Sequence, residues 1–287
     1  MSRIMIGVSG WNYKGWRGKF YPDDLVQRRE LEFAAETFDS IEINGTFYSL
    51  TTPDSCERWY RAAPEDFLYA VKGSRFITHN KKLATGDSAI PNFFASGILE
   101  LADKLGPLLW QLSGRLHFRP ERVEAFFDYL PGDTEEAAEI ARNHDERVKK
   151  PSFGPGGRRP MRHVLEVRHE SFLTDELVDL ARRHGVALAF SHSSAWPYIE
   201  EITSDFIYVR LHGPDRLYDS AYGEGLGEWA KRMQAWAAGE APADSHRITE
   251  RDPPPAEDRD VYVYFDNDGH AYAPNEARTL MEMVGRG

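Results

Sequence analysis

The sequence predicts an α/β fold of the parallel barrel type: a (β/α)8 barrel with eight parallel strands and a short or missing helix after strand six. Three observations predict this fold. Strand-like apolar runs alternate with helix-like stretches along the chain, a pattern typical of parallel sheets. The strand-like runs number eight, which is the number that closes such a barrel. A length of 287 residues also suits a single barrel of this type.

Each strand-like run is short, apolar and bounded by turn residues. The first run, IMIGVS, begins close to the N-terminus, and the last run, VYVYFD, lies near the C-terminus. We expect the eight strands at residues 4–9, 40–44, 67–73, 107–112, 163–168, 186–191, 206–212 and 261–266.

The stretches between these runs carry apolar residues at helical spacing. The clearest begins at Thr174, a candidate N-cap, and ends at Gly185, a C-terminal stop signal. After strand six, the segment SSAWPYIEEITSD is too short for more than a single helical turn. We expect helices at residues 29–38, 53–63, 95–105, 120–130, 174–185, 226–239 and 275–284.

Two segments are longer than a barrel needs. Residues 131–162 combine a charged, helix-prone piece with a Gly/Pro-rich linker, and residues 240–260 are polar and Pro-rich. Both follow a helix and precede a strand, so we expect loop insertions at the bottom face, away from the end where barrel enzymes do chemistry. Residues 1–287 then form a single barrel domain, and no internal repeat is visible in the sequence.

Composition limits the class of protein. Hydrophobic residues make up 41% of the chain and aromatics 13%, which supplies a large core and excludes a disordered chain. The formal net charge of −11 disfavours non-specific attraction to nucleic acid, so nucleic acid is a possible but not a favoured partner. Cys56 is the only cysteine, which excludes an intrachain disulfide and a cysteine-based metal cluster.

The same features indicate a compartment. A single cysteine fits a reducing environment, and the N-terminal run lacks the pattern of a signal peptide. No apolar stretch approaches the length of a membrane span. We therefore expect a soluble cytoplasmic protein with no membrane partner, whose oligomeric state the sequence does not fix.

The run YVRLHG identifies the face of the strands on which polar side chains gather. Side chains alternate across a strand, so Arg210 and His212 share one face while the aliphatic residues between them share the other. The aliphatic face suits packing against helices, which leaves the polar face pointing into the barrel near its carboxyl end. By the same alternation, five other strands direct polar side chains into the barrel. These residues are Glu42, Asn44, Lys72, Gln111, Glu166, Arg168 and Asp266.

This set of side chains predicts an anion site with acid–base groups. Lys72, Arg168 and Arg210 are cations, and the guanidinium fork of arginine suits a carboxylate or phosphate. Glu42, Glu166 and His212 are the candidate catalytic residues, because neighbouring charges can separate their pKa values. Asn44, Asp266 and the three cations are candidate substrate-binding residues. The alternative is structural: the carboxylates then only neutralise the cations.

Aromatic residues follow strands one and two and are expected at the rim of the barrel. Trp11 lies in GWNYKGW, and Tyr48 lies in NGTFYSL. Such rings can stack on a sugar or base, or they can pack as a roof over the barrel. We count Trp11 and Tyr48 as candidate substrate-binding residues.

Metal dependence is an open alternative, and no cofactor is predicted. Glu42, Glu166, His212 and Asp266 are acceptable ligands for Mg, Mn or Zn, so a divalent metal is possible. The nearby cations oppose a dication unless an anion accompanies it. The first strand is not followed by Gly-x-Gly-x-x-Gly, which removes the main support for a dinucleotide site.

Several segments together are similar to the DUF72 (YecE-like) family of TIM-barrel proteins, whose activity is unassigned. They are GVSGWNYKGWRGKFYP, FDSIEINGTFYSLTTPDSCERWYRAAPEDFLYAVKGSRFITH, LEVRHESF, YVRLHG and YVYFDNDGHAYAPNEA, so the resemblance covers nearly the entire chain. It implies a signature of Glu42, Asn44, Thr46, Tyr48, Lys72, Glu166, Arg168, Arg210, His212 and Asn267, and through it Asn267 joins the substrate-binding candidates. Two departures stand out: Asp266 replaces the family's usual Asn, and Ser191 and His192 stand where strand six commonly ends in Asp.

The leading hypothesis is an enzyme that binds a small anionic substrate, bearing phosphate or carboxylate, and uses strand-end carboxylates or histidine for acid–base catalysis. One alternative is a metal-dependent enzyme that cleaves phosphodiesters or nucleotides, by analogy of fold with apurinic endonucleases. The other is a binding protein without catalysis. The sequence identifies neither the substrate nor the reaction class.

Overall fold

Nine parallel strand segments form one sheet in the computed structural model, which describes residues 2–285. The order in the sheet is β6-β5-β4-β3-β2-β1-β9-β8-β7, so neighbours in sequence are neighbours in space. The segments are β1 (Ile4–Ser9), β2 (Ser40–Ile43), β3 (Leu68–Lys72), β4 (Leu105–Gln111), β5 (His163–Glu166), β6 (Ala187–Leu188), β7 (Phe190–His192), β8 (Phe206–Leu211) and β9 (Asp260–Phe265).

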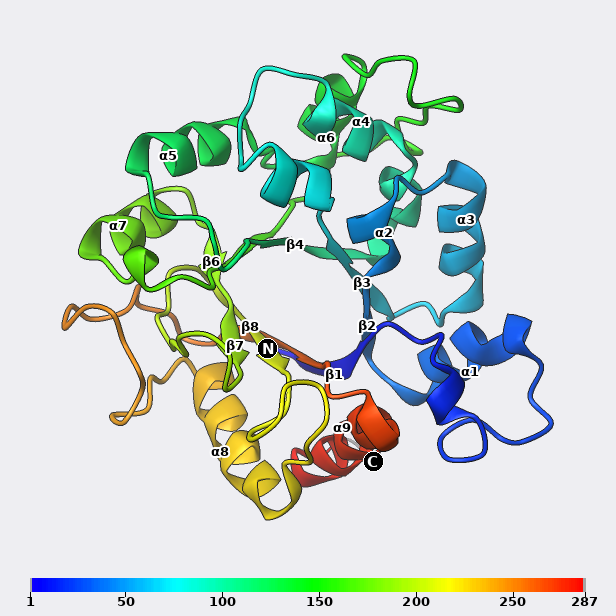
Figure 1. The fold of residues 1–287 in the computed structure, drawn as a ribbon, viewed down its shortest axis with the longest axis vertical. Coiled ribbons are helices and arrows are strands. Elements are labelled where there is room, and N and C mark those ends of the chain that lie inside the picture. Colours follow the sequence, from blue (N-terminus) through cyan, green and yellow to red (C-terminus); the bar gives the residue numbers. More distant parts are fainter. Residues whose placement is uncertain (1, 286–287) are drawn as a thin grey trace.

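The extra segment arises because the predicted sixth strand is split at Ala189. Its first half, β6, pairs with β5, and its second half, β7, pairs with β8. The Ala189 N–H between them donates to the carbonyl of Leu165. The two edges of the sheet are thus halves of one run, which curls the sheet into the ring seen in Figure 1. The predicted parallel α/β barrel is confirmed.

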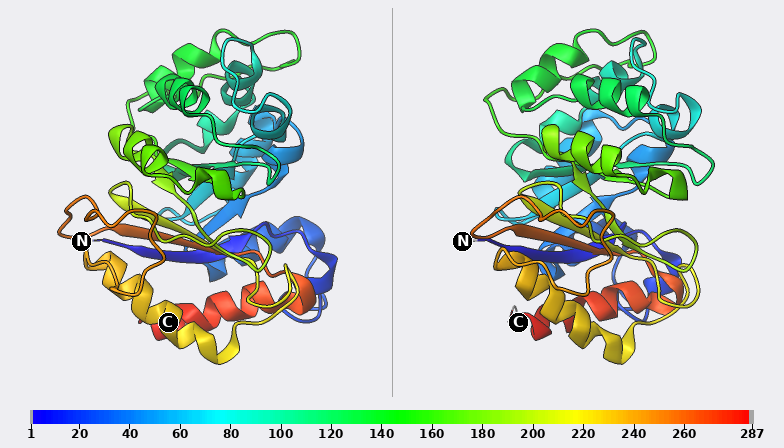
Figure 2. Two further views of the ribbon diagram at one scale, coloured as in Figure 1. Left: turned by 60° about the vertical axis from the view of Figure 1, so that its left-hand side comes forward. Right: turned by 90° about the vertical axis from the view of Figure 1, so that its left-hand side faces the viewer.

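Helices surround this ring, as Figures 1 and 2 show. Thr174 caps the helix predicted there, accepting from the Leu177 N–H at 3.2 Å, and no helix lies between His192 and Phe206, as expected. The helices are α1 (Glu30–Thr37), α2 (Gly45–Tyr48), α3 (Pro53–Ala62), α4 (Ala89–Ala95), α5 (Pro120–Tyr129), α6 (Thr134–Ala141), α7 (Asp175–Arg183), α8 (Leu226–Ala237) and α9 (Tyr272–Met283).

The helix predicted at residues 95–105 is wrong. The α-helix of this region, α4, ends at Ala95, and a 3-10 segment follows at Ile98–Lys104. Gly97 has φ +113°, and Ala102 has φ +51°. A right-handed helix does not continue through residues with left-handed backbone, so these two positions break the predicted element.

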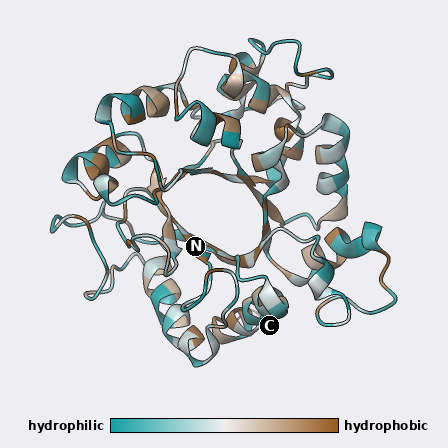
Figure 3. Ribbon diagram, in the orientation of Figure 1, coloured by the Kyte–Doolittle hydropathy of each residue, from teal (hydrophilic) through white to brown (hydrophobic). Residues whose placement is uncertain are grey.

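The barrel strands separate two hydrophobic layers, as the parity of the sequence predicts. The inner layer includes Ala70, Leu109, Tyr208 and Tyr264. The outer layer holds the alternate strand residues, which pack against the helices. Figure 3 shows apolar colouring along the strands and polar colouring on the outer turns and loops. Among residues 2–285, none of the helices has the length and apolar character needed to cross a membrane.

The two expected insertions pack against the outer helices. In residues 131–162, the helix-prone piece forms α6, and the segment is fastened where the Asp145 carboxylate accepts from Asn92 of α4 at 3.0 Å. It also reaches the first turn of α3, because Lys150 Nζ lies 3.4 Å from Asp54, and that turn follows the carboxyl end of β2. Part of this segment therefore extends beyond the bottom face. Residues 240–260 pack beside α7 and α8.

Candidate functional site

The guanidinium of Arg210, on β8, is the centre of the polar cluster at the carboxyl end of the barrel. Its Nε donates to Glu42 at 2.9 Å, and its Nη1 donates to Glu166 at 2.8 Å and to His212 at 2.9 Å. Its Nη2 donates to Glu42 at 2.7 Å and to Asp266 at 2.9 Å. These contacts use all five N–H groups of the arginine. Arg210 is 0% exposed, so it has no donor free for the anion that the sequence suggested it would clamp.

Glu42 and Glu166 are the fixed negative charges of the cluster. Both are 0% exposed. Burial alone would raise the pKa of Glu42, but the charges of Arg210 and Lys72 outweigh burial and hold that pKa below its usual value. Burial is likewise outweighed at Glu166, where Arg168 and Arg210 lower the pKa. Both groups therefore stay ionised and serve first as partners of the arginines.

His212 is held as a neutral imidazole. Its Nε2 accepts from Arg210 Nη1 at 2.9 Å, and because arginine is always protonated, that nitrogen carries no hydrogen. Burial, followed by the charge of Arg210, lowers the pKa of His212 well below its ordinary value. The remaining proton is then on Nδ1, which is buried and has no partner among the described residues. Trp196 and Tyr218 lie against the ring, with centroids 4.9 and 5.8 Å away.

Asp266, at the end of β9, is the carboxyl group of the cluster that can titrate near neutral pH. Burial raises its pKa to about 6, against the lowering effect of Arg210 and Lys72. It is 9% exposed and also lies 3.3 Å from His212 Nε2. An acid with this pKa can both donate and accept a proton under physiological conditions.

Lys72, at the end of β3, is the cation of the cluster that keeps its donors free. Its side chain makes no hydrogen bond or ion pair with any residue of 2–285, and its Nζ lies 4.5 Å from the centroid of the Phe47 ring. Burial, together with the charge of Arg210, lowers the pKa of Lys72 to about 8. The ammonium is therefore available to a ligand.

Arg168 lies between the floor of the cluster and the mouth of the barrel. Its Nε donates to Glu166 at 2.6 Å, and its Nη2 donates to Gln111 at 3.1 Å. The Trp196 ring lies 3.7 Å from the guanidinium carbon. The side chain is 14% exposed, so Arg168 is more accessible than Arg210.

The other predicted substrate-binding residues make contacts of their own, and of these four only Asn44 is linked to the cluster within residues 2–285, through Ser9. Asn44 donates to Ser9 Oγ at 2.8 Å, and its Oδ1 has no partner among the described residues. Asn267 donates to the Ser220 carbonyl at 2.9 Å and to Glu276 at 2.8 Å, so its amide fastens the loop after β8 to α9. Tyr48 is 72% exposed at the end of α2. Trp11 packs edge-on against Trp59.

Two residues of the site, Ser9 and Tyr218, were not among the sequence candidates, and Tyr13, from the rim segment GWNYKGW, contacts Ser9. Ser9, at the end of β1, donates a short hydrogen bond to Glu42, and the parity rule applied to IMIGVS would have found it. Tyr13 donates to the Ser9 carbonyl at 2.6 Å. Tyr218 lies in an irregular loop with φ +63°, where no periodic signal exists, so only the structure could find it.

The carboxylates of the cluster are engaged by Arg210 rather than gathered for a cation. Among residues 2–285, no three His, Cys, Asp or Glu side chains are arranged to hold a metal ion. The geometry therefore offers no support for the metal-dependent alternative.

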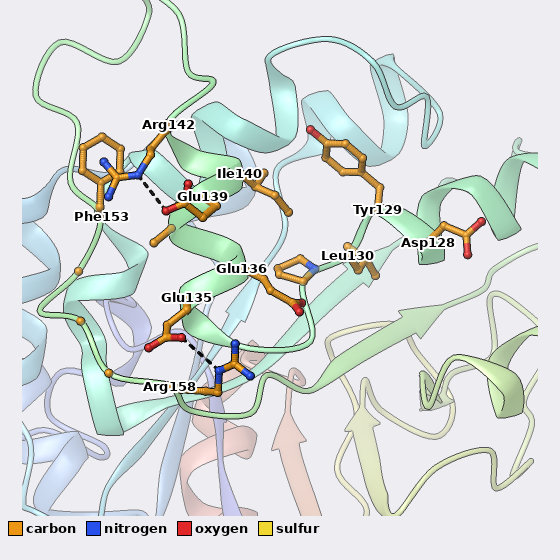
Figure 4. A pocket seen from close by; sticks show the side chains of 15 residues that line it. Asp128, Tyr129, Leu130, Glu135, Glu136, Glu139, Ile140, Arg142, Phe153 and Arg158 are labelled. Atoms are coloured by element: carbon orange, nitrogen blue, oxygen red, sulfur yellow. Dashed lines mark hydrogen bonds and ion pairs between the residues drawn. The ribbon is translucent and has the colours of Figure 1, made fainter.

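One hollow of the structure lies elsewhere, on the outer ring. Its volume is about 760 Å³, and it is bounded by α5, α6 and residues 153–158 (Figure 4). Its charges pair with one another, as Glu135 does with Arg158 at 3.1 Å and Glu139 with Arg142 at 3.2 Å. We place the candidate site at the strand ends because the free ammonium of Lys72 and the unpartnered Nδ1 of His212 belong to the cluster there.

Comparison with known proteins agrees with the fold. A DUF72 family protein of known structure from Thermotoga maritima aligns with a TM-score of 0.70 at 21% identity, over 98% of this chain and 99% of that one. A DUF72 family protein from Enterococcus faecalis aligns with a TM-score of 0.67 at 15% identity, over 98% of this chain and 95% of that one. These structural similarities support the barrel fold alone and do not indicate an activity.

Sequence comparison gives the family. The chain is 25% identical to the UPF0759 protein YecE of Escherichia coli K12 over 242 residues, which are 81% of this chain and 82% of that protein. It is 27% identical to the UPF0759 protein YunF of Bacillus subtilis over 79 residues, 28% of this chain and 27% of that one. The family model described as "Protein of unknown function DUF72" matches residues 5–287. The resemblance seen in the sequence is thereby confirmed, and the chain belongs to the DUF72 family.

Proposed function

We propose that the cluster at the carboxyl end of the barrel is the active site of an enzyme acting on a small anionic substrate that bears a carboxylate or phosphate. The observation that carries the proposal is the free ammonium of Lys72. It is buried to 8% exposure without an ion pair to a described residue, whereas isolated buried charge is unfavourable. An anionic ligand would supply the missing partner.

Under this proposal the candidate residues have four different roles. Arg210, Glu42 and Glu166 form a buried frame, because their charges already satisfy one another. Lys72 and Arg168 hold the anion, since both lie nearer the mouth. Asp266 moves the proton, because its pKa of about 6 lies close to physiological pH. His212, with its buried Nδ1–H, donates a hydrogen bond to the ligand.

A thermal-shift screen in a chelating buffer tests the proposal. The ligands are inorganic phosphate, sugar acids and nucleotides. A ligand present at 100 times its Kd stabilises the folded state by about 2.7 kcal/mol, and we expect a carboxylate or phosphate compound to do so. The stabilisation should disappear in Lys72→Met and in Arg168→Ala. It should persist in Lys82→Met, which removes an exposed lysine.

The other outcomes separate the alternatives. Stabilisation by nucleotides alone, and only after a divalent metal is added, would favour a phosphodiester-cleaving enzyme. Stabilisation without turnover of the bound compound would favour a binding protein. Stabilisation that survives in Lys72→Met would contradict the site. We also propose a reducing compartment such as the cytoplasm, because the lone Cys56 is buried.

A further inference from the structure

Two lysines are buried in the barrel, and their ammonium groups have opposite surroundings. Lys104 is 5% exposed, and its Nζ donates to the carbonyls of Tyr60 and Ala63, at 2.7 Å each. Lys72 is 8% exposed, and its Nζ has no such acceptor among residues 2–285. The partners of Lys104 explain its burial structurally. The burial of Lys72 has no equivalent explanation by hydrogen bonds to carbonyls.

The surroundings of Lys72 lower its pKa and so raise the fraction of the side chain that is neutral. The Phe47 ring lies 4.5 Å from Nζ. Arg210 repels a second positive charge, while Glu42, Asp266 and Glu166 attract it, and burial with Arg210 prevails to give a pKa of about 8. About one tenth of Lys72 is then a free amine at pH 7. A free amine in a desolvated site beside another cation is the arrangement that activates lysine as a nucleophile.

We propose that Lys72 forms a Schiff base with a carbonyl substrate that also carries an anionic group, such as a 2-oxo acid or a phosphorylated aldehyde or ketone. This inference rests on the proposed function, because it places the substrate at the same mouth and assigns its anionic group to Arg168. The ammonium form of Lys72 still attracts the anionic substrate, and its free-amine form acts on the carbonyl carbon.

The step balances with groups present in the site. The Nζ lone pair attacks the carbonyl carbon, the C–N bond forms, and the carbonyl electrons move to oxygen. One proton passes from nitrogen to that oxygen and gives a carbinolamine. Asp266 then protonates the hydroxyl, water leaves, and the nitrogen lone pair closes the C=N bond. The products are a protonated iminium, one water and the Asp266 carboxylate, without an oxidant or reductant.

Reductive trapping tests the proposal. The full-length protein is incubated at pH 7 with glyoxylate, pyruvate or dihydroxyacetone phosphate and with sodium cyanoborohydride, and lysine peptides are quantified by mass spectrometry. We expect at least about tenfold more reduced adduct on the Lys72 peptide than on any other lysine peptide, because Lys72 combines a lowered pKa with burial beside Arg210 in the site. Lys72→Met should remove this adduct. Lys82→Met and Lys81→Met should leave it unchanged.

The results separate this inference from the proposed function. The inference is overturned if none of the three probes labels Lys72, or if labelling is equal on Lys81, Lys82 and Lys72. If Lys72 is labelled while phosphate and sugar acids fail to stabilise the protein, the inference stands and the anion clamp fails. Lys72→Arg provides a further check, since it keeps the charge, cannot form the iminium and should show no adduct even where it remains folded.

Discussion

Individual residues of the cluster differ in how many of their polar atoms have a hydrogen-bond or ion-pair partner. Arg210 donates to three carboxylates and a histidine, so removing it would leave buried charge uncompensated. Lys72 has no partner among the described residues, and the Nδ1 of His212 and the Oδ1 of Asn44 are also unpartnered. Buried polar groups are normally paired. Other buried atoms without a partner in the described part of the chain, such as Nε of Arg259 and Nε1 of Trp236, lie outside the cluster. The residue-level argument for a ligand therefore rests on the free ammonium of Lys72 in the same cluster as the unpartnered Nδ1 of His212.

Asp266 gives a prediction about pH. Its pKa rises from 3.8 to about 6 on folding, chiefly through burial, so the folded state binds this proton more tightly than the unfolded state. Binding of this proton contributes fully to the free energy of unfolding below about pH 4. The contribution is lost as the pH rises through about 6, at up to about 1.4 kcal/mol per pH unit. Asp266→Asn removes this dependence.

Urea denaturation of both proteins from pH 4 to pH 7 measures the effect. The wild-type free energy of unfolding, relative to that of Asp266→Asn, should fall between about pH 4 and pH 6 and then level off. Asp66→Asn, at an exposed position, should give a curve parallel to the wild type. A parallel curve for Asp266→Asn would mean that Asp266 has an ordinary pKa in the folded protein.

At the scale of elements, strand parity predicted which side chains face the interior. The structure places Glu42, Lys72, Glu166, Arg210 and Asp266 inside, as the alternation required. Parity could not predict their pairing, because Arg210 and Glu42 are 168 positions apart and meet only when the barrel closes. It also failed at strand six, where Ala187 and Leu188 fit either face. In the structure, Ala187 faces the inner layer and Leu188 the outer one.

The prediction of helices was less accurate than that of strands, and the local sequence explains why. The helix at 174–185 was found because capping and periodicity agree there. The helix at 95–105 was predicted wrongly because left-handed backbone at Gly97 and Ala102 is invisible in an apolar run. Helix α2, with four residues, is too short to show a period.

Gly73 sets the position of the end of β3 and hence of Lys72. A Cβ at Gly73 would lie 2.3 Å from Cε3 of Trp110, which is fully buried. Gly73→Ala should therefore overpack the outer layer, lower the free energy of unfolding by about 1–3 kcal/mol, and reduce trapping at Lys72. Urea denaturation and the trapping assay measure the two effects.

A matched glycine separates packing from backbone effects in this test. Gly227 in α8 has open space where its Cβ would stand, so Gly227→Ala should be neutral or slightly stabilising. The double variant Gly73→Ala with Trp110→Phe should recover part of the lost stability, because the smaller ring yields room. If the double variant recovered no stability, the destabilisation by Gly73→Ala would have a cause other than the contact with Trp110.

At the scale of the whole molecule, the site depends on the net charge of the chain and on closure of the barrel. The chain carries a net charge of −11, so its overall field would slow the approach of an anion. Attraction must then come from the cluster itself, where three cations face three carboxylates. Such a local balance requires a closed barrel, because the charged groups belong to strands spread around the ring.

Closure depends on Thr203 at the gap in the ring. Its buried hydroxyl accepts from the Leu188 N–H at 3.1 Å and donates to the Val186 carbonyl at 2.7 Å, so it takes the place of a strand partner beside β6. Thr203→Val keeps the shape and removes the hydroxyl. Two buried backbone groups then lose their partner, which should cost about 1–3 kcal/mol for each.

Hydrogen exchange and urea denaturation measure this dependence. In Thr203→Val, the Leu188 amide should lose protection, because β6 opens from the ring more often, and the free energy of unfolding should fall. Thr203→Ser keeps the hydroxyl and should stay close to the wild type, and Thr279→Val, exposed on α9, should change little. If Thr203→Ser were as unstable as Thr203→Val, the methyl group of Thr203 rather than its hydroxyl would stabilise the closure of the ring beside β6. The split sixth strand would then close the barrel by packing alone.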